Sequence, residues 1–291
     1  MRAGAPEEQE FREWSLALGD GRLPTFGPSN NIVRLPDECV LDESDSLITA
    51  VFGQQIDVDS QASVSRCILA TTNLRVLELN NQIIQRLDGP EHTLLSEDSI
   101  IDEGEGDDMI RQYPIESVHD MLPSGLPPHK LVLKQNAIVM LLCNIDTTKG
   151  FCNGTRMLVK EVRDRLLVLE VLCGPNKGNV LFLPRFSMQE RDSRLPFKIK
   201  RVQFPVRLSY AMTINKAQGQ TFDYVGIDLT EPVFAHGQLY VAVSRVRAFR
   251  NLKFRISTLG NFQGRQTLAN GVTGVFTTNL VYRSILNIGR H

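Results

Sequence analysis

Two neighbouring stretches, Ala211–Asp223 (AMTINKAQGQTFD) and His236–Arg245 (HGQLYVAVSR), decide how this chain is interpreted. In the first, a helical segment around Ile214–Gly219 ends in glycine and leads into an apolar strand at Tyr224–Asp228. Short polar side chains and a glycine at a helix end let a phosphate or a nucleotide approach the backbone closely. An ordinary capped helix would give the same pattern, so the first stretch alone leaves two interpretations open.

The second stretch ends in an arginine that follows an apolar run. The apolar residues are Leu239, Val241 and Val243, and Arg245 follows Ser244 directly. An arginine at the end of a buried element can be held rigidly at an interface, where it binds phosphate oxygens and stabilises charge in phosphoryl transfer. The alternative is an arginine that caps a helix C-terminus.

Composition points to an ordinary globular protein, with 42% hydrophobic and 22% charged residues. No apolar run approaches the roughly 18 residues of a membrane span, and the first residues lack the apolar segment of a secretory signal. The five cysteines have no CxxC spacing, which favours reduced thiols in a cytosolic or nuclear protein. The five histidines are dispersed, so we expect no metal site.

Charge is distributed unevenly although the formal net charge is only −1. Residues 91–120 carry ten acids and one arginine, whereas residues 156–201 carry eleven Lys/Arg and five acids. After Glu231 there is no acid at all. A basic C-terminal half could face phosphates, and a solvated mixed surface is the alternative.

The middle of the chain has its own pattern. Short β-runs between 130 and 186, separated by turns at Asn153-Gly154 and Gly174–Gly178, predict a small inserted β-barrel. Ser96–Asp108 holds seven acids and two glycines, which predicts a solvated loop.

The motifs, taken together, resemble those of the PIF-one-like DNA helicases, superfamily 1B, in particular the versions carried by Helitron-type transposons. CILATTNLRVLELNNQII (67–84) resembles their motif four, and residues 122–159 resemble their accessory β-barrel. TTNLVYRSIL (277–286) resembles their C-terminal ending. The resemblance covers most of 60–291, and residues 1–30 resemble the segment that follows motif three.

The resemblance implies an α/β chain: a RecA-like second motor domain of a P-loop helicase with an inserted small β-barrel, and a first motor domain that is largely missing. The second motor domain is expected in two segments, 59–120 with an acidic loop at 88–112, and 201–258, on either side of the barrel at 121–200. A remnant that follows the first motor domain (1–58) and a C-terminal tail (259–291) complete the chain.

The resemblance also implies roles for individual residues. Arg245 would be the arginine finger that reaches the γ-phosphate held by the other motor domain. Gln218 and Gly219 would lie at the nucleotide cleft. The residues expected near the DNA backbone are Thr72, Asn73, Thr213, Lys216 and Thr221.

The sequence contains neither a G-x-x-x-x-G-K-[ST] phosphate loop nor an acidic pair that would hold magnesium. Gly174–Gly178 has the wrong residue order, and Asp37-Glu38 follows Pro36 without a preceding apolar strand. We therefore expect ATP and Mg²⁺ to act only in the intact motor, with no tight binding, hydrolysis or unwinding by this chain alone.

The expected partners are single-stranded DNA and the missing first motor domain, in cis or in trans, and no membrane. The family implies 5′-to-3′ DNA unwinding in replication, repair, recombination, telomere maintenance or transposition, in the nucleus or, alternatively, in mitochondria. Two other functions stay open: a non-catalytic single-stranded-DNA-binding module and a truncated transposon-derived remnant.

Overall fold

The computed structural model describes residues 6–56, 61–101, 114–123, 125–190, 197–257, 263–268 and 271–282. The chain divides into two compact units, one made of Met1–Leu79 with Ala211–His291 and the other of Asn80–Tyr210. The segment 121–200, where the sequence predicts a barrel, falls within the second of these units. Among the described residues, no helix combines the length and apolar character that a membrane crossing requires.

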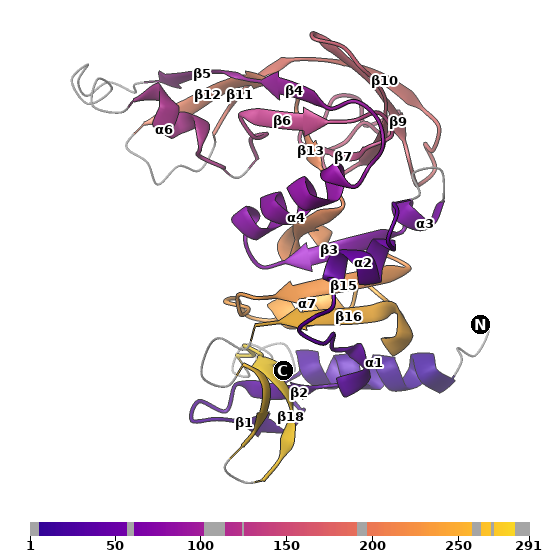
Figure 1. Cartoon of the computed structure of the whole chain (residues 1–291), viewed down its shortest axis with the longest axis vertical. Coiled ribbons are helices and arrows are strands. Elements are labelled where there is room, and N and C mark those ends of the chain that lie inside the picture. Colours follow the sequence, from indigo (N-terminus) through magenta and orange to yellow (C-terminus); the bar gives the residue numbers. More distant parts are fainter. Residues whose placement is uncertain are drawn as a thin grey trace, which may run out of the picture. The chain divides into compact units, whose positions relative to one another are not determined.

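The first unit is built on a parallel four-stranded sheet in the order β14-β3-β15-β16 (Figure 1). Its strands are β3 (Arg66–Ala70), β14 (Ala211–Thr213), β15 (Tyr224–Leu229) and β16 (Leu252–Ile256). The inner strands β3 and β15 read as apolar runs and almost every one of their residues is buried, whereas the edge strand β16 (LKFRI) alternates apolar and charged residues. This is the pattern of a sheet covered on both faces.

Short helices connect and cover these strands. They are α1 (Pro6–Gly19), η1 (Asp37–Cys39), α2 (Leu47–Phe52), α3 (Gln61–Val64), α4 (Asn73–Gln85), η2 (Ile214–Ala217), α7 (Gln238–Val243) and η3 (Phe249–Asn251). Helix α2 begins after Ser46, whose Oγ accepts a hydrogen bond from the Thr49 backbone N–H at 3.3 Å, so Ser46 supplies its N-terminal cap.

Two close contacts fix the packing in this unit. A Cβ added at Gly226, in the middle of β15, would lie 2.6 Å from Val51 and 2.8 Å from Leu47, so only glycine lets α2 pack this closely. On α1, Trp14 contacts Phe249 with a centroid distance of 5.3 Å and Phe11 with one of 6.0 Å. Trp14 therefore belongs to a packed aromatic cluster.

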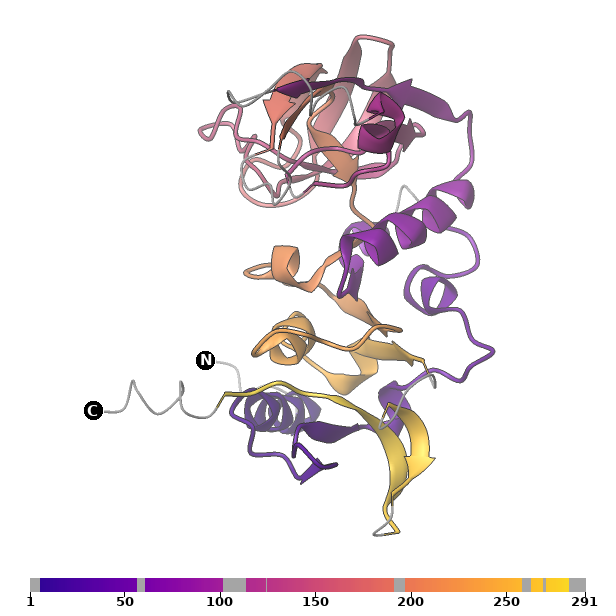
Figure 2. The same cartoon turned by 90° about the vertical axis from the view of Figure 1, so that its left-hand side faces the viewer.

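A second sheet in the first unit joins the two ends of the sequence. Its order is β1-β2-β18-β17, with β1 (Thr25–Phe26), β2 (Ile32–Leu35), β17 (Gly264–Thr267) and β18 (Thr273–Thr278). Figures 1 and 2 show the yellow C-terminal strands beside the indigo N-terminal ones. The expected tail at 259–291 thus contributes two strands, while 258–262, 269–270 and 283–291 lie outside the described residues.

The second unit is mostly antiparallel. A five-stranded sheet has the order β10-β9-β8-β7-β13, and its strands are β7 (Ile138–Leu141), β8 (Arg156–Val162), β9 (Leu166–Val171), β10 (Val180–Pro184) and β13 (Val206–Leu208). The remaining elements are β4 (His92–Leu95), β5 (Glu97–Ile101), α6 (Ile115–His119), β6 (Lys130–Leu133), β11 (Phe186–Gln189) and β12 (Lys198–Gln203). The β-runs predicted between 130 and 186 are confirmed.

The acidic segment 88–112 requires a correction. Its residues 92–95 pair with β6 and its residues 97–101 pair with β12, so this stretch is sheet rather than loop. In the register Asp98 lies opposite Arg201, which forms an ion pair with it and makes an acid compatible with this strand. Residues 102–113 lie outside the described residues.

Candidate functional site

Arg245 is anchored by neutral hydrogen-bond acceptors at the end of α7. Its Nε donates to the carbonyl oxygen of Val241 at 2.8 Å, and its Nη2 donates to the Ser244 Oγ at 2.8 Å. Its Nη1 donates to the carbonyl oxygens of Gln220 at 2.9 Å and Ala217 at 3.4 Å. The guanidinium therefore links α7 to the turn at the sequence KAQG (Lys216–Gly219, called the KAQG turn below). It thus joins the two stretches that the sequence singles out.

The charge of this guanidinium has no acidic partner among the described residues, since all its hydrogen-bond acceptors are carbonyls and a hydroxyl. Arg245 is half-buried, and burial lowers its pKa, against a smaller opposing effect of Tyr240. An oxyanion next to Arg245 would supply the missing negative charge. The site is thus suited to a phosphate that comes from outside this unit.

The turn that carries these carbonyls depends on glycine. Gly219 has a φ of +81°, a left-handed conformation that other residues rarely adopt, while a Cβ added there would meet no atom within 4 Å. The backbone, and not the space around it, therefore requires glycine. Gln218 and Gly219 are exposed next to Arg245, and the Gln220 N–H closes the turn on the Ala217 carbonyl oxygen at 3.0 Å.

A second group of candidate residues lies at the carboxyl edge of the parallel sheet. The Thr72 Oγ1 accepts a hydrogen bond from the Arg75 N–H at 3.3 Å, so it caps α4, of which Asn73 is the first residue. Thr213 ends β14 and lies opposite Ala70, the last residue of β3. The structure thus brings Thr72, Asn73 and Thr213 to one edge of the sheet, where open α/β sheets bind their ligands.

The two groups lie at different edges. The Phe222 N–H donates to the Arg245 carbonyl oxygen at 2.9 Å, and the Asp223 N–H donates to the carbonyl oxygen of Ser65 at 2.8 Å. Because Ser65 precedes β3 directly, Arg245 lies at the amino edge. Thr221, next to Phe222 and exposed, therefore lies with Arg245 rather than with Thr213. Lys216 lies between the groups along the chain, on η2.

One ion pair at the carboxyl edge is not predicted by the sequence. Arg75 donates through Nε and Nη2 to the Asp228 Oδ2, at 3.1 and 2.9 Å, and through Nη1 to the Glu78 Oε2 at 2.8 Å. Burial works to lower the pKa of Arg75, but the hydrogen bonds to these carboxylates outweigh it and raise the pKa. The buried Asp228 ends the predicted strand, yet nothing in the sequence indicates that it pairs with Arg75, which lies on helix α4.

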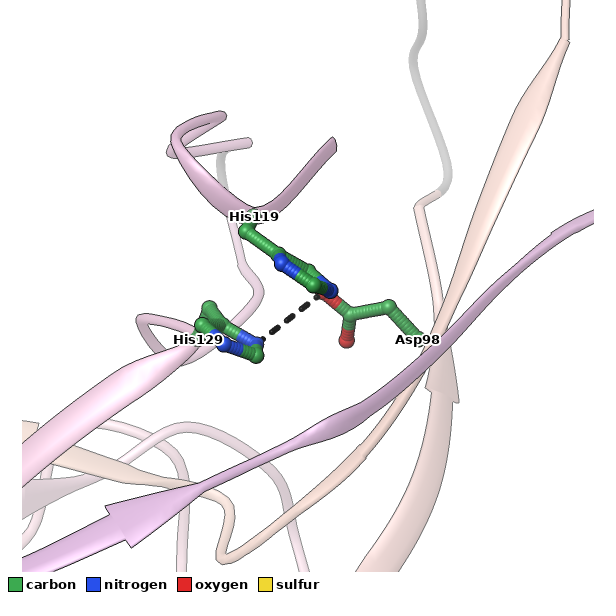
Figure 3. A group of neighbouring side chains, drawn as sticks. All are labelled: Asp98, His119 and His129. Atoms are coloured by element: carbon green, nitrogen blue, oxygen red, sulfur yellow. Dashed lines mark ion pairs between the residues drawn. The ribbon is translucent and has the colours of Figure 1, made fainter. Parts of the chain in front are cut away.

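A polar cluster in the second unit is also missed by sequence reasoning. Asp98, His119 and His129 converge from β5, the end of α6 and the segment before β6, with potential ligand atoms within 4.8 Å of one another (Figure 3). These are residue types that bind divalent metals. However, both oxygens of Asp98 already accept hydrogen bonds from Arg201, at 2.8 and 2.6 Å.

The two imidazoles are arranged as a stack rather than as a metal site. The rings of His119 and His129 are nearly parallel, at 9°, with centroids 3.7 Å apart, and the His129 Nδ1 lies 2.8 Å from the Ser96 Oγ. Imidazole lone pairs lie in the ring plane, so stacked rings do not point at a common ion. The cluster is therefore accounted for as a structural network.

Comparison with known proteins supports the same family as the motifs do. Residues 119–162 match the family model described as the 2B domain of the DNA helicase Pif1. The ATP-dependent DNA helicase PIF1 of Homo sapiens is 40% identical over 126 residues, which are 42% of this chain and 19% of that protein. The PIF1 of Xenopus laevis is 30% identical over 210 residues, 65% of this chain and 30% of that protein.

Solved structures share the fold. A Bacteroides Pif1 helicase in complex with ADP-AlF3 and ssDNA aligns with a TM-score of 0.56 and 19% identity, over 100% of this chain and 54% of that one. Pif1 from Candida albicans aligns with a TM-score of 0.54 and 20% identity, over 84% and 53%. This chain thus spans about half the length of these helicases and less of the curated relatives. The family match, the curated relatives and the shared mixed α/β fold confirm the resemblance of this chain to the Pif1 DNA helicases, over a portion of their length.

Proposed function

We propose that this chain acts as the second motor domain of a Pif1-type 5′-to-3′ DNA helicase, with an inserted β-barrel. The parallel sheet β14-β3-β15-β16 with its covering helices supports a RecA-like domain, and the five-stranded antiparallel sheet supports the barrel. The barrel strands overlap the residues that match the 2B domain model. In this proposal a first motor domain, in cis or in trans, completes the motor.

The anchoring of Arg245 is the single observation that carries the proposal. A guanidinium held by three carbonyl oxygens and a hydroxyl, with no carboxylate among these partners, is positioned but not neutralised. Such an arginine can stabilise the charge that develops in phosphoryl transfer, a contribution of roughly 10³- to 10⁵-fold in kcat for arginine fingers. Gln218 and Gly219 would line the same nucleotide cleft.

ATP with Mg²⁺ would supply the phosphoryl group and a charge-neutralising cation in the complete motor. In this chain Arg245 would stabilise the negative charge of the transferred phosphoryl group, but the sequence contains no phosphate loop to hold the triphosphate. We therefore propose that the chain alone neither hydrolyses ATP nor unwinds DNA. Action in the nucleus, or in mitochondria, and in repair, recombination, telomere maintenance or transposition belongs to the same proposal.

The carboxyl edge of the parallel sheet would contact single-stranded DNA. Thr72, Asn73 and Thr213 lie there together, and hydroxyl and amide groups on such an edge can donate to phosphate oxygens. Lys216 would contribute from η2, which follows β14, whereas Thr221 lies at the amino edge beside Arg245 and is not part of this surface. Solved relatives include Pif1 bound to ssDNA, which favours this ligand.

A second function, a non-catalytic single-stranded-DNA-binding module, is favoured by the missing phosphate loop together with the retained carboxyl edge. A third, a remnant without a folded role, predicts neither DNA binding nor cooperative unfolding.

Titration of the purified chain into fluorescently labelled oligo(dT), read as anisotropy at several salt concentrations, tests the proposal. We expect micromolar binding that weakens with salt, a cooperative thermal transition and no ATP hydrolysis. Absence of binding, or hydrolysis by the chain alone that Arg245→Ala abolishes, would contradict it.

A further inference from the structure

Two buried hydrogen-bond donors, two residues apart in the second unit, have no acceptor among the residues that the structure describes. They are the Nε of Arg207 and the Oγ of Ser209. Buried donors are nearly always satisfied, by protein or by bound water, so two in one place require an explanation.

The strand register places a second arginine on the same face of the five-stranded sheet. Arg207 on β13 lies opposite Met140 on β7, and Met140 lies opposite Arg156 on β8. Two strand spacings separate the arginines, which puts their Cα atoms about 10 Å apart. Ser209 lies two residues after Arg207, on the same face, and its carbonyl oxygen accepts from the Arg156 Nη2 at 2.9 Å.

The Arg207 guanidinium has no counterion in the part of the chain that the structure describes. Its Nη2 donates to the carbonyl oxygen of Leu126 at 3.1 Å, and no acid among the described residues forms an ion pair with it. Burial lowers the pKa of Arg207 to about 10. Arg207 is half-buried as a residue, with its Nε covered, and Arg156 near it is buried. Because cations removed from water are normally paired, an Arg207 without an acidic partner among the described residues is a costly arrangement for a protein without a ligand.

The chemistry of the site selects its ligand. Arg207 and Ser209 present donors, beside the second positive charge of Arg156. A water molecule could satisfy one or both donors but would leave the charge of Arg207 uncompensated, whereas a tetrahedral oxyanion meets both requirements. We propose that Arg207 and Ser209, beside Arg156, bind a phosphate group in the second unit.

The phosphate has two possible sources, the backbone of the single-stranded DNA of the proposed function or a free phosphate or nucleotide. The chemistry of recognition is the same for both. The first source rests on the proposed function, and the second does not.

Calorimetric titration of inorganic phosphate into the whole chain tests the site. Arg207→Met removes the charge while keeping an apolar side chain of similar length, and Ser209→Ala removes one donor. Arg165→Met is the matched control, because Arg165 is an exposed arginine of the same unit. Potassium chloride at equal ionic strength separates specific binding from screening.

We expect phosphate binding that is roughly 10- to 100-fold weaker in Arg207→Met, roughly 10-fold weaker in Ser209→Ala, and unchanged in Arg165→Met. Without phosphate, Arg207→Met should unfold at a temperature no lower than the unchanged protein, since an uncompensated charge has been removed. Phosphate binding no different from the effect of chloride, or undiminished in Arg207→Met, would overturn the proposal. If Arg207→Met does not fold, Ser209→Ala decides in the same way.

An oligo(dT) titration then identifies the source. Weaker DNA binding by Arg207→Met, with a salt slope reduced by about one, assigns the site to the DNA backbone. Undiminished DNA binding with lost phosphate binding assigns it to free phosphate or a nucleotide. If the chain binds no DNA at all, the proposed function fails, while the phosphate titration still tests the site.

Discussion

Arg201 is the fully buried cation that organises the second unit, and its replacement is the most quantitative test of the structure. Each of its three nitrogens donates to at least one acceptor. Nε and Nη2 donate to the Asp98 carboxylate at 2.8 and 2.6 Å. Nη1 and Nη2 also donate to the carbonyl oxygens of Val118 at 2.9 Å, Pro127 at 3.0 Å and Met121 at 3.4 Å. This one side chain therefore fastens α6 and the following loop to β5 and β12.

Replacing Arg201 by methionine leaves the Asp98 carboxylate buried without its cation and removes the donors of three carbonyl groups. Breaking a buried ion pair on one side costs about 3–5 kcal/mol. In the double variant Arg201→Met/Asp98→Leu no uncompensated charge remains, so it should be more stable than the single variant by about 1–2 kcal/mol.

Urea unfolding at pH 7, followed by far-UV circular dichroism, measures both variants. The single tryptophan, Trp14, lies in the first unit, so its fluorescence reports whether that unit is unchanged. Arg163→Met serves as control, because Arg163 pairs with Glu161 on the surface and should shift the midpoint little. A cost below about 1 kcal/mol for Arg201→Met, or a double variant no more stable than the single one, would refute the reasoning.

Three further predictions concern pH, packing and thiol reactivity. Burial lowers the pKa of His129 below the value of about 6.5 that it has in the unfolded chain. Between these two pKa values the unfolded chain binds more protons than the folded one, so the stability of the fold falls on acidification. Burial would raise the pKa of Asp98, but its hydrogen bonds from Arg201 lower it, so a second loss of stability follows at more acidic pH. In melting curves measured across this pH range, His129→Gln should abolish only the first loss of stability. Gly226→Val should cost about 1–3 kcal/mol or more in the Trp14-monitored transition. Its Cβ would lie 2.6 and 2.8 Å from two side chains of α2, and an unchanged midpoint would be inconsistent with that packing. Burial raises the pKa of the Cys39 thiol to about 12, so iodoacetamide at pH 8 should label the exposed Cys173 and spare Cys39, and equal labelling would show that the first unit opens.

The sequence predicts those elements of this fold that local patterns determine. Apolar runs and turn residues between 130 and 186 predict short β-strands, and the run at Tyr224–Asp228 predicts a further strand; these strands are present. The sequence also singles out Arg245 and the turn before β15, and in the structure the Arg245 Nη1 donates to the carbonyl oxygens of Ala217 and Gln220, on either side of Gly219.

What the sequence leaves out depends on partners far along the chain. The segment at 97–101 carries acids that predict a loop, yet it forms β5, in which Asp98 pairs with Arg201, 103 residues away. The separation of Thr221 from Thr213 follows from the direction of the chain between two strands, which no residue pattern reveals. The unpaired charge of Arg207 likewise becomes visible only when the sheet register is known.

The central claim is that Arg245 completes a nucleotide site whose triphosphate is held by another motor domain. Its most direct test is the DNA-stimulated ATPase activity of this chain joined to the first motor domain of a Pif1 relative. Arg245→Ala should reduce kcat by roughly 10³-fold or more, while Arg247→Ala, which removes an exposed arginine two residues further on, should leave kcat unchanged. Undiminished activity in Arg245→Ala, or equal losses in the two variants, would contradict the account.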